Sequence, residues 1–205
     1  CNEAPTKYVA EQLKKRMPDV VIMVGGPSTH ASYYKGDDLF DYIVNGEGEQ
    51  PLLLALESIE KKQGIQYNEK EKSMIIRQPE NQRYNLSTLP LPDYSDFDFS
   101  KYKFPNGALC EISRGCIAKC TFCEETHFWK YRQRNALSTL DEIEHMYYEH
   151  GTNVFWFIDS LVNGNLNELR GFVKGVAEKE LDIHWTGYCR CDGRMDAEYY
   201  KDLKA

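Results

Sequence analysis

Short apolar runs that end at glycine or polar turns, with helical patterns between them, limit the fold most strongly. Val20-Val21-Ile22-Met23-Val24 is continuous and ends at Gly25-Gly26-Pro27, which is typical of a parallel strand buried on both faces. Residues 41–44 form a second such run. The helix expected next has Pro51 at its first position and Gly64 after its end. This alternation predicts an α/β fold.

Helical periodicity accompanies these strands. Residues 6–17 are predicted to form a helix that Pro18 ends. The apolar stripes expected to be buried are Val9, Leu13 and Met17 in this helix, and Leu52, Leu56 and Ile59 in the next one. Residues 1–64 are interpreted as one α/β unit. Residues 65–107 carry several prolines and many Asp, Asn and Ser residues, which favours a linker laid over a surface.

The alternation resumes at residue 108. Strands are predicted at 108–112, 154–158 and 183–190. Ser138 is expected to cap the first following helix, with Asp141 at capping-box spacing, and Gly151 to end it. The expected buried stripes are Leu140, Ile143 and Tyr147, and then Leu166, Leu169, Val173 and Val176, before a last helix that begins near Asp196. Residues 108–205 therefore resemble successive βα units.

Composition argues against several functions. The longest apolar runs in the 205 residues are far too short for a membrane span. A net charge of −7 opposes nucleic-acid binding, and the basic run at 130–134 is more typical of a solvated face. Seven cysteines, an odd and clustered set, argue against a secreted disulfide framework. We therefore expect a cytoplasmic protein in which close cysteines serve metal or redox chemistry.

The loop at 113–123 carries the clearest chemical signal. Cys116, Cys120 and Cys123 follow a predicted strand with C-x₃-C-x₂-C spacing. Three thiolates on so short a loop suit a [4Fe–4S] cluster and leave one iron open to another ligand. Two alternatives remain at this point: a zinc site that His127 completes, and three unconnected thiols.

This spacing resembles that of the radical S-adenosylmethionine (SAM) superfamily. Phe122 before the last cysteine, the preceding Arg114-Gly115 and the downstream βα repeats fit the same resemblance. It implies that Cys116, Cys120 and Cys123 hold the cluster and that the open iron binds the amino and carboxylate groups of SAM. One electron would cleave SAM to methionine and a 5′-deoxyadenosyl radical, which takes a hydrogen atom from substrate. Phe122 would pack near the cluster or adenine.

Asp159 and Arg190 are further candidates for binding SAM. Asp159 ends a strand as in cobalamin-dependent members of the superfamily, where it could accept a charge-assisted hydrogen bond from the SAM ammonium; capping a helix or anchoring a loop is the alternative. Period two places Arg190 on a polar strand face with Asp192. Arg190 is interpreted either as a ligand of the SAM carboxylate or as an ion-pair partner of Asp192. Cys189 and Cys191, on the opposite face, are expected to pack as small apolar residues.

The glycines of the first unit permit close approach of the backbone to a ligand. Their order, followed by Leu89-Pro90-Leu91-Pro92-Asp93-Tyr94 and the cysteine loop, closely resembles the cobalamin-binding radical SAM class over nearly the whole chain. The residues that this resemblance implies in cobalamin binding are Gly25, Gly26, Gly46, Glu47 and Gly48. The Asp-x-His-x-x-Gly motif of that class is absent, so His30 is not interpreted as a cobalt ligand.

The expected architecture is the C-terminal half of a doubly wound, Rossmann-like cobalamin-binding domain (1–64), a linker (65–107) and about three βα units of a TIM-type radical SAM barrel (108–205). We expect the middle of a longer protein that is not catalytically competent by itself. The resemblance implies a cobalamin-dependent methyltransferase that receives electrons from flavodoxin or ferredoxin, with its substrate unidentified. The alternatives are a radical SAM enzyme with a vestigial cobalamin domain that performs cyclisation or rearrangement, and a non-catalytic iron–sulfur or zinc module.

Overall fold

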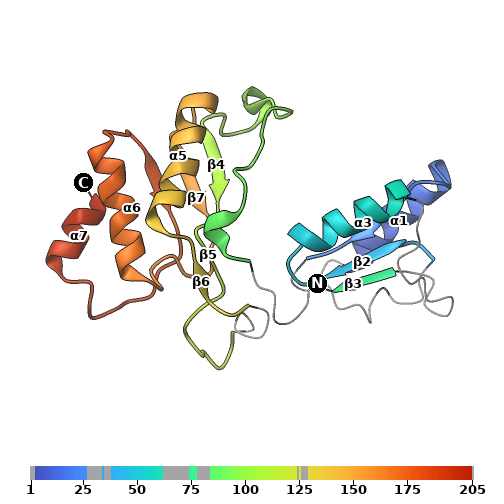
Figure 1. The fold of residues 1–205 in the computed structure, drawn as a ribbon, viewed down its shortest axis with the longest axis horizontal. Coiled ribbons are helices and arrows are strands. Elements are labelled where there is room, and N and C mark those ends of the chain that lie inside the picture. Colours follow the sequence, from blue (N-terminus) through green and yellow to red (C-terminus); the bar gives the residue numbers. More distant parts are fainter. Residues whose placement is uncertain are drawn as a thin grey trace. The chain divides into compact units, whose positions relative to one another are not determined.

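The computed structural model describes residues 3–26, 34, 38–61, 74–77, 84–123, 125 and 129–204. The chain divides into two compact units, Cys1–Arg83 (unit 1) and Tyr84–Ala205 (unit 2) (Figure 1). Within these described ranges, every helix is too short or too polar to cross a membrane.

Unit 1 contains a three-stranded parallel sheet in the order β1-β2-β3. The strands are β1 (Met23–Val24), β2 (Tyr42–Asn45) and β3 (Met74–Arg77). Helix α1 (Glu3–Arg16) precedes the sheet, and α3 (Glu49–Lys61) follows β2. The predicted parallel α/β arrangement is confirmed. The interpretation of 65–107 as a linker missed β3, because its Met74-Ile75-Ile76 run is very short and Pro79 follows it closely.

The faces buried in unit 1 differ from those predicted. Val21 is 45% exposed and lies before the short strand β1, so the prediction of burial on both faces is wrong at this residue. On α1, Ala10 is buried, whereas Val9 is exposed. On α3, Leu52 and Leu56 are exposed, and the buried positions are Pro51, Ala55 and Ser58. Small side chains face inward at these positions, which periodicity among large apolar residues cannot identify.

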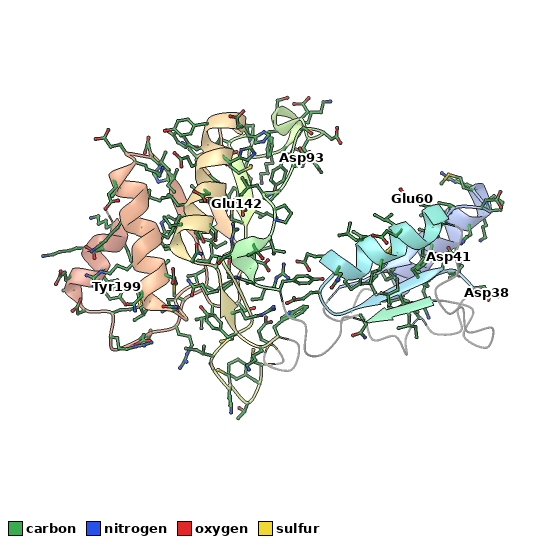
Figure 2. All side chains as sticks on the ribbon, in the orientation of Figure 1. Asp38, Asp41, Glu60, Asp93, Glu142 and Tyr199 are labelled. Carbon is green, nitrogen blue, oxygen red and sulfur yellow. The ribbon has the colours of Figure 1, made fainter. Side chains whose placement is uncertain are left out.

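Asp41 links three parts of unit 1. Its carboxylate accepts a hydrogen bond from the backbone N–H of Ile22, at 2.8 Å, and pairs with Lys14 Nζ at 2.8 Å. Lys14 Nζ also donates to the carbonyl of Val20, at 2.7 Å. The end of α1 is thereby joined to the strands at residues that border β1 and β2; Figure 2 labels Asp41.

Unit 2 is built on a second parallel sheet, in the order β4-β7-β8. Its strands are β4 (Gly107–Cys110), β7 (Val154–Phe157) and β8 (His184–Thr186). Its helices are α5 (Ala136–His150), α6 (Leu166–Glu178) and α7 (Ala197–Lys204). Two 3₁₀ turns, η1 (Leu86–Thr88) and η2 (Phe99–Lys101), precede β4. A ribbon of β5 (Ser113–Arg114) and β6 (Arg132–Gln133) completes the unit.

The core of unit 2 lies between its sheet and helices. Cys110, Phe155 and Phe157 on the sheet are buried in one cluster with Ile143 of α5 and Phe172 of α6. The two helices pack closely: a Cβ placed on Gly175 would lie 2.6 Å from Leu140 Cδ2. Leu109, on the opposite face of the sheet, is 57% exposed. The alternating βα order predicted for 108–205 is therefore present, with one sheet face covered by helices.

The N-terminal cap of α5 differs from the prediction, whereas its C-terminal end agrees with it. Asn135, not Ser138, caps α5: its side-chain oxygen accepts from the Ser138 N–H at 2.8 Å. Ser138 is thus the residue whose N–H is capped, and the prediction that it is the cap is wrong. Gly151 ends α5 with φ 63°, as predicted, because glycine adopts this left-handed conformation without strain.

Candidate functional site

The cysteine loop follows β4 and is closed at its base by the β5–β6 ribbon. Arg114 pairs with Arg132, and Ser113 with Gln133, across this antiparallel ribbon. Gly115 leaves β5 with φ 79°. A Cβ at this position would lie 2.7 Å from the carbonyl oxygen of Trp129, so only glycine fits without a shift of the backbone. The residue directly before Cys116 is therefore fixed by close approach of the two arms of the loop.

The three thiols of the loop have different surroundings. Cys120 is exposed, whereas Cys116 and Cys123 are partly buried. The N–H of Ala118 donates to Cys116 Sγ at 3.4 Å, and the N–H of Cys123 donates to the Cys120 carbonyl at 3.1 Å. Phe122, expected near the cluster or adenine, is 89% exposed. The loop thus presents its three soft sulfur ligands on one short stretch of chain.

The donor set fits an iron–sulfur cluster, since clusters of this type are held by cysteine thiolates. In the described part of the chain, however, no three His, Cys, Asp or Glu side chains are gathered closely enough to hold a metal ion. The three sulfurs share a loop without converging on one centre. His127, the alternative fourth ligand for zinc, lies outside the described residues. Ligation by Cys116, Cys120 and Cys123 therefore stays a prediction.

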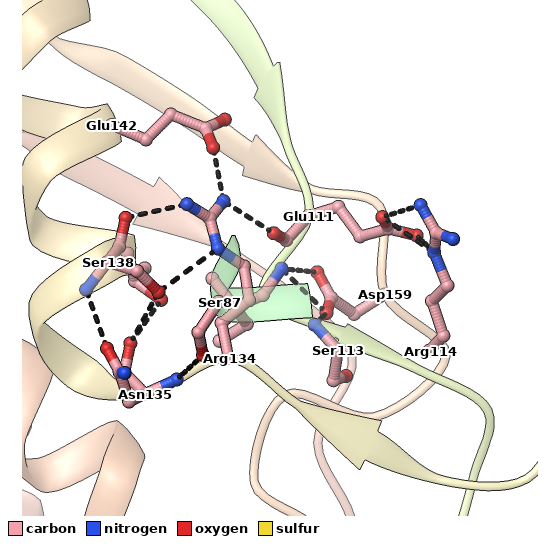
Figure 3. Close-up of polar contacts among 11 residues, drawn as sticks. Ser87, Glu111, Ser113, Arg114, Arg134, Asn135, Ser138, Glu142 and Asp159 are labelled. Carbon is pink, nitrogen blue, oxygen red and sulfur yellow. Dashed lines mark hydrogen bonds and ion pairs between the residues drawn. The ribbon is translucent and has the colours of Figure 1, made fainter. Parts of the chain in front are cut away.

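Asp159 follows β7 and is turned toward the backbone that leads into the cysteine loop. Its carboxylate accepts hydrogen bonds from the N–H groups of Ile112, at 3.0 Å, and Ser113 (Figure 3). Asp159 is only 2% exposed. Burial raises its pKa to about 6, against hydrogen bonds from Ser113 and Ile112 that favour the charged form. The structure thus gives Asp159 a loop-anchoring contact, and its contact with SAM remains a prediction.

The other arm of the loop is also fixed. Arg134 N–H donates to the Ile112 carbonyl at 2.8 Å, and the Arg134 guanidinium pairs with Glu142 of α5 in the interior (Figure 3). The same guanidinium donates to the carbonyls of Ser138 and Glu111. Arg134 is therefore held within the protein and is not available to a phosphate, which removes one of the basic residues at 130–134 from any nucleic-acid surface.

A cavity of about 240 Å³ lies beside the cysteine loop. It is lined by Ile117, Leu161, Asn163, Arg190, Cys191, Asp192 and Gly193. Arg190, predicted to bind the SAM carboxylate, therefore lines the same cavity as Ile117, which lies between Cys116 and Cys120. Asp192 pairs with Arg194 at 2.5 Å, and this guanidinium holds the pKa of Asp192 well below its usual range. The alternative partner proposed for Arg190 is thus engaged by Arg194.

Asn163 shapes this cavity and escaped the sequence analysis. Its side chain is 2% exposed. Its amide nitrogen donates to the Arg190 carbonyl at 2.8 Å, and its oxygen accepts from the Arg190 N–H at 3.0 Å. A polar residue six positions after the end of β7 has no periodic signature. The only available signal was its position after the predicted strand 154–158, where ligands of parallel sheets gather.

The cysteines outside the loop fall into two classes. Cys110 is buried in the core, and burial together with Glu142 raises the pKa of its thiol well above the ordinary value. Such a thiol is unreactive and serves packing. Cys189 and Cys191 are both exposed. The expectation that these two pack as small apolar residues is wrong, because β8 ends at Thr186 and the following segment lies at the surface.

The residues predicted to bind cobalamin lie at the carboxyl ends of β1 and β2. Because these strands are parallel neighbours, the turn with Gly25 and Gly26 and the turn with Gly46 and Gly48 share one edge of the sheet. Gly26 has φ 119° and Gly46 has φ 102°. Glu47, in contrast, is 3% exposed. The glycines thus fit an approach of backbone to ligand, while Glu47 faces the interior; cobalamin contact by all five residues remains a prediction.

Comparisons with curated proteins find relatives that match most of the chain. No family model matches the chain. It is 26% identical over 225 residues to cytidylyl-2-hydroxyethylphosphonate methyltransferase of Streptomyces wedmorensis, with 88% of the chain covered. It is 29% identical over 222 residues to anaerobic magnesium-protoporphyrin IX monomethyl ester cyclase of Cereibacter sphaeroides, with 96% covered. The chain spans only 41% and 36% of the length of these relatives.

Two solved structures share the fold. The cobalamin-dependent SAM radical enzyme OxsB, with aqua-cobalamin bound, matches 98% of the chain with a TM-score of 0.67 at 15% identity. The radical SAM methyltransferase TsrM of Kitasatospora setae, with cobalamin and a [4Fe–4S] cluster bound, matches 98% with a TM-score of 0.62 at 16% identity. The chain spans 31% and 42% of these two proteins.

These matches define a mixed α/β protein with the parallel sheets of cobalamin-binding and radical SAM enzymes. The resemblance to cobalamin-binding radical SAM proteins noted in the sequence recurs in the fold, because the two solved structures are radical SAM enzymes with cobalamin bound. Both methyltransferases and cyclases occur among these relatives.

Proposed function

We propose that this chain is part of an enzyme that cleaves SAM reductively at a [4Fe–4S] cluster and also uses cobalamin. The observation that carries the proposal is the position of the cysteine loop: it leaves β4 of a parallel sheet and borders a polar cavity that contains Arg190. Cys116, Cys120 and Cys123 would hold the cluster. When bound, the cluster supplies one electron to SAM, and the cobalamin supplies a carrier for a methyl group.

The chain's own residues would bind and orient SAM. The Arg190 guanidinium at the cavity is the group suited to the SAM carboxylate, since arginine recognises carboxylates in a bidentate manner. Ile117, on the loop itself, borders the same cavity and would exclude water from one wall. Gly25, Gly26, Gly46, Glu47 and Gly48 are proposed for cobalamin, and the exposed glycines among them for its nucleotide tail. Phe122 is kept as a candidate for contact with SAM, whereas the Asp159 carboxylate, expected from the sequence to bind SAM, is bonded to the N–H groups of Ile112 and Ser113.

Ligation would bring the three sulfurs together, because among the described residues they are not gathered closely enough to hold a metal ion. Such coupling between ligand binding and local folding is common where thiolates are the ligands. The ribbon of β5 and β6 would stay fixed during closure, since Arg134, Glu142 and Asp159 hold it to the body of unit 2. Among the described residues, 116–123 are therefore the ones that would move.

Methyl transfer to an unreactive carbon is the reaction that we favour. The methyltransferase of Streptomyces wedmorensis and TsrM support it. Ring closure is the second candidate, favoured by similarity to the magnesium-protoporphyrin cyclases. A cytoplasmic location and an electron donor such as flavodoxin or ferredoxin are part of the proposal, because reductive cleavage needs a low-potential electron. The substrate is not assigned.

The cluster is tested by anaerobic reconstitution of the full-length protein with iron and sulfide, followed by EPR of the reduced protein with and without SAM. We expect a cluster signal that changes when SAM is added. Cys116→Ala, Cys120→Ala and Cys123→Ala should each abolish that change, whereas Cys110→Ala and Cys189→Ala serve as matched controls that retain it. Bound zinc without a cluster signal would contradict the proposal. A cluster signal that ignores SAM would favour a non-catalytic module.

Cobalamin binding is tested separately by titration of the full-length protein with hydroxocobalamin. We expect a change in the visible absorption of the cofactor, lost in a variant that carries Gly25→Val and Gly26→Val together. No binding by the unaltered protein would favour a vestigial cobalamin domain. Analysis of the SAM-derived products then separates the reactions: methylated product supports transfer, whereas 5′-deoxyadenosine without methylation supports cyclisation or rearrangement.

A further inference from the structure

Residues 159–163 follow β7 by one residue and form a mostly buried segment that contacts both the entry to the cysteine loop and the chain after β8. Asp159, Leu161, Val162 and Asn163 are each at most 2% exposed, whereas Ser160 is exposed. Buried polar groups need partners to offset the loss of water. The partners of this segment lie on both sides of it.

The contacts on the first side hold the entry to the cysteine loop. Asp159 accepts from the backbone N–H groups of Ile112 and Ser113. The hydroxyl of Ser113 donates to the Leu161 carbonyl at 2.9 Å. Ile112 and Ser113, immediately before Arg114-Gly115-Cys116, are therefore bonded to the 159–163 segment through two backbone N–H groups and one hydroxyl. These bonds set the position from which the three cysteines project.

The contacts on the second side hold the chain that carries Arg190. The Val162 N–H donates to the Tyr188 carbonyl at 3.0 Å. The Asn163 side chain bonds both the N–H and the carbonyl of Arg190. Asn163 also donates to Met195 Sδ, at 3.2 Å. The Asn163 amide bonds the backbone on both sides of the Arg190 Cα. These two bonds fix the direction in which the Arg190 side chain points from the backbone.

We propose that Asp159 and Asn163 are positioning residues. Asp159 holds the backbone that leads into the cysteine loop, and Asn163 holds the backbone of Arg190. The segment between them keeps the loop and Arg190 at fixed positions on either side of the cavity. This inference rests on the proposed function, because it assigns SAM to the space between Ile117 and Arg190. Asp159 acts through backbone amides, so it affects the cluster before SAM is bound. A direct SAM ligand at this position would affect SAM binding alone.

The role of Asp159 is tested with Asp159→Asn in the full-length reconstituted protein. The matched control is Asp182→Asn, at an exposed carboxylate just before β8. The amide keeps the shape of the side chain but replaces one acceptor oxygen with a donor that faces backbone N–H groups. Cluster retention in Asp159→Asn should fall on the order of tenfold, as found for residues that orient metal ligands. The EPR spectrum without SAM should also differ from that of the unaltered protein.

The role of Asn163 is tested with Asn163→Ala, and Ser160→Ala is the control from the same segment. Cluster content and the EPR spectrum without SAM should match those of the unaltered protein. The dissociation constant for SAM should rise roughly tenfold, because two hydrogen bonds that fix the Arg190 backbone are lost. The same loss from Arg190→Ala, without further loss in the double variant, would show that Asn163 acts through Arg190.

The outcomes separate this inference from the proposed function. No cluster in the unaltered protein contradicts the proposed function itself. If the unaltered protein binds cluster and SAM but Asp159→Asn loses only SAM binding, Asp159 is a SAM ligand and the inference is wrong. Should Asp159→Asn fail to fold by circular dichroism, Asp159→Glu takes its place, because the longer side chain keeps the charge but moves the carboxylate from the N–H groups of Ile112 and Ser113. Unchanged cluster retention in this variant overturns the inference.

Discussion

The guanidinium of Arg134 pairs with the carboxylate of Glu142 inside unit 2, where the two side chains are 8% and 7% exposed. The pair joins the end of the β5–β6 ribbon to α5. Arg134 also bonds the carbonyls of Glu111 and Ser138, so its charge and its donors are met within the protein. One buried guanidinium thus connects the base of the cysteine loop to the helix that covers the sheet.

Removal of one member of this pair should be strongly destabilising. We expect Glu142→Ala to lower the free energy of unfolding by about 3–5 kcal/mol, because Arg134 would keep an uncompensated buried charge. The double variant Arg134→Met with Glu142→Leu should regain most of that loss. Urea denaturation of the three proteins checks this. A single variant as stable as the unaltered protein would show that the pair is exposed in solution.

Gly115 should tolerate substitution less well than another glycine of similar backbone conformation. Gly115 has φ 79° and Gly151 has φ 63°, so alanine costs about 1–2 kcal/mol of backbone strain at each. At Gly115 the new Cβ would also lie 2.7 Å from the Trp129 carbonyl oxygen, whereas nothing lies within 4 Å at Gly151. We expect Gly115→Ala to be the more destabilising by about 1–3 kcal/mol in urea denaturation. Equal losses would contradict the close approach of the loop's two arms.

The stability of the protein should depend on pH through Asp159. Burial raises the pKa of this carboxyl to about 6 in the folded protein, from 3.8. The folded state therefore holds its proton more tightly, and this stabilisation is lost as the pH rises from 3.8 through about 6. The loss is about 3 kcal/mol at about 1.4 kcal/mol per pKa unit. Urea denaturation across this range should show a shallower pH dependence for Asp159→Asn; identical profiles would rule out the raised pKa.

Alkylation should distinguish the cysteines of unit 2. In the cluster-free protein we expect iodoacetamide to modify the exposed Cys120, Cys189 and Cys191 rapidly and the buried Cys110 only on unfolding. Reconstitution with iron and sulfide should then protect Cys116, Cys120 and Cys123 and leave Cys189 and Cys191 reactive. Mass spectrometry of the digested protein identifies the modified sites. Protection of Cys189 or Cys191 by the cluster would contradict the proposed ligand set.

The sequence predicted the type and order of most elements correctly. Each of the correctly predicted strands is a short apolar run, and its neighbours in the chain carry helical periodicity, so local pattern sufficed. Gly151 was correctly predicted to end α5, because a left-handed helix end favours glycine. The strand β3 and the β5–β6 ribbon were missed, since their few residues owe their conformation to pairing with distant segments.

Side-chain roles depended on the tertiary structure far more. Sequence spacing identified Cys116, Cys120 and Cys123 as a group, because their chemistry and separation are local. No feature of the neighbouring sequence identifies Asn163 as the residue whose side chain bonds the backbone of Arg190, which lies 27 residues further along the chain. Likewise, Asp159 was predicted at the site, but only folding shows that it accepts from backbone N–H groups 46 and 47 residues earlier. Sequence spacing shows which side chains lie close together along the chain. Burial and long-range hydrogen bonds, which form only in the folded protein, decide what each side chain contacts.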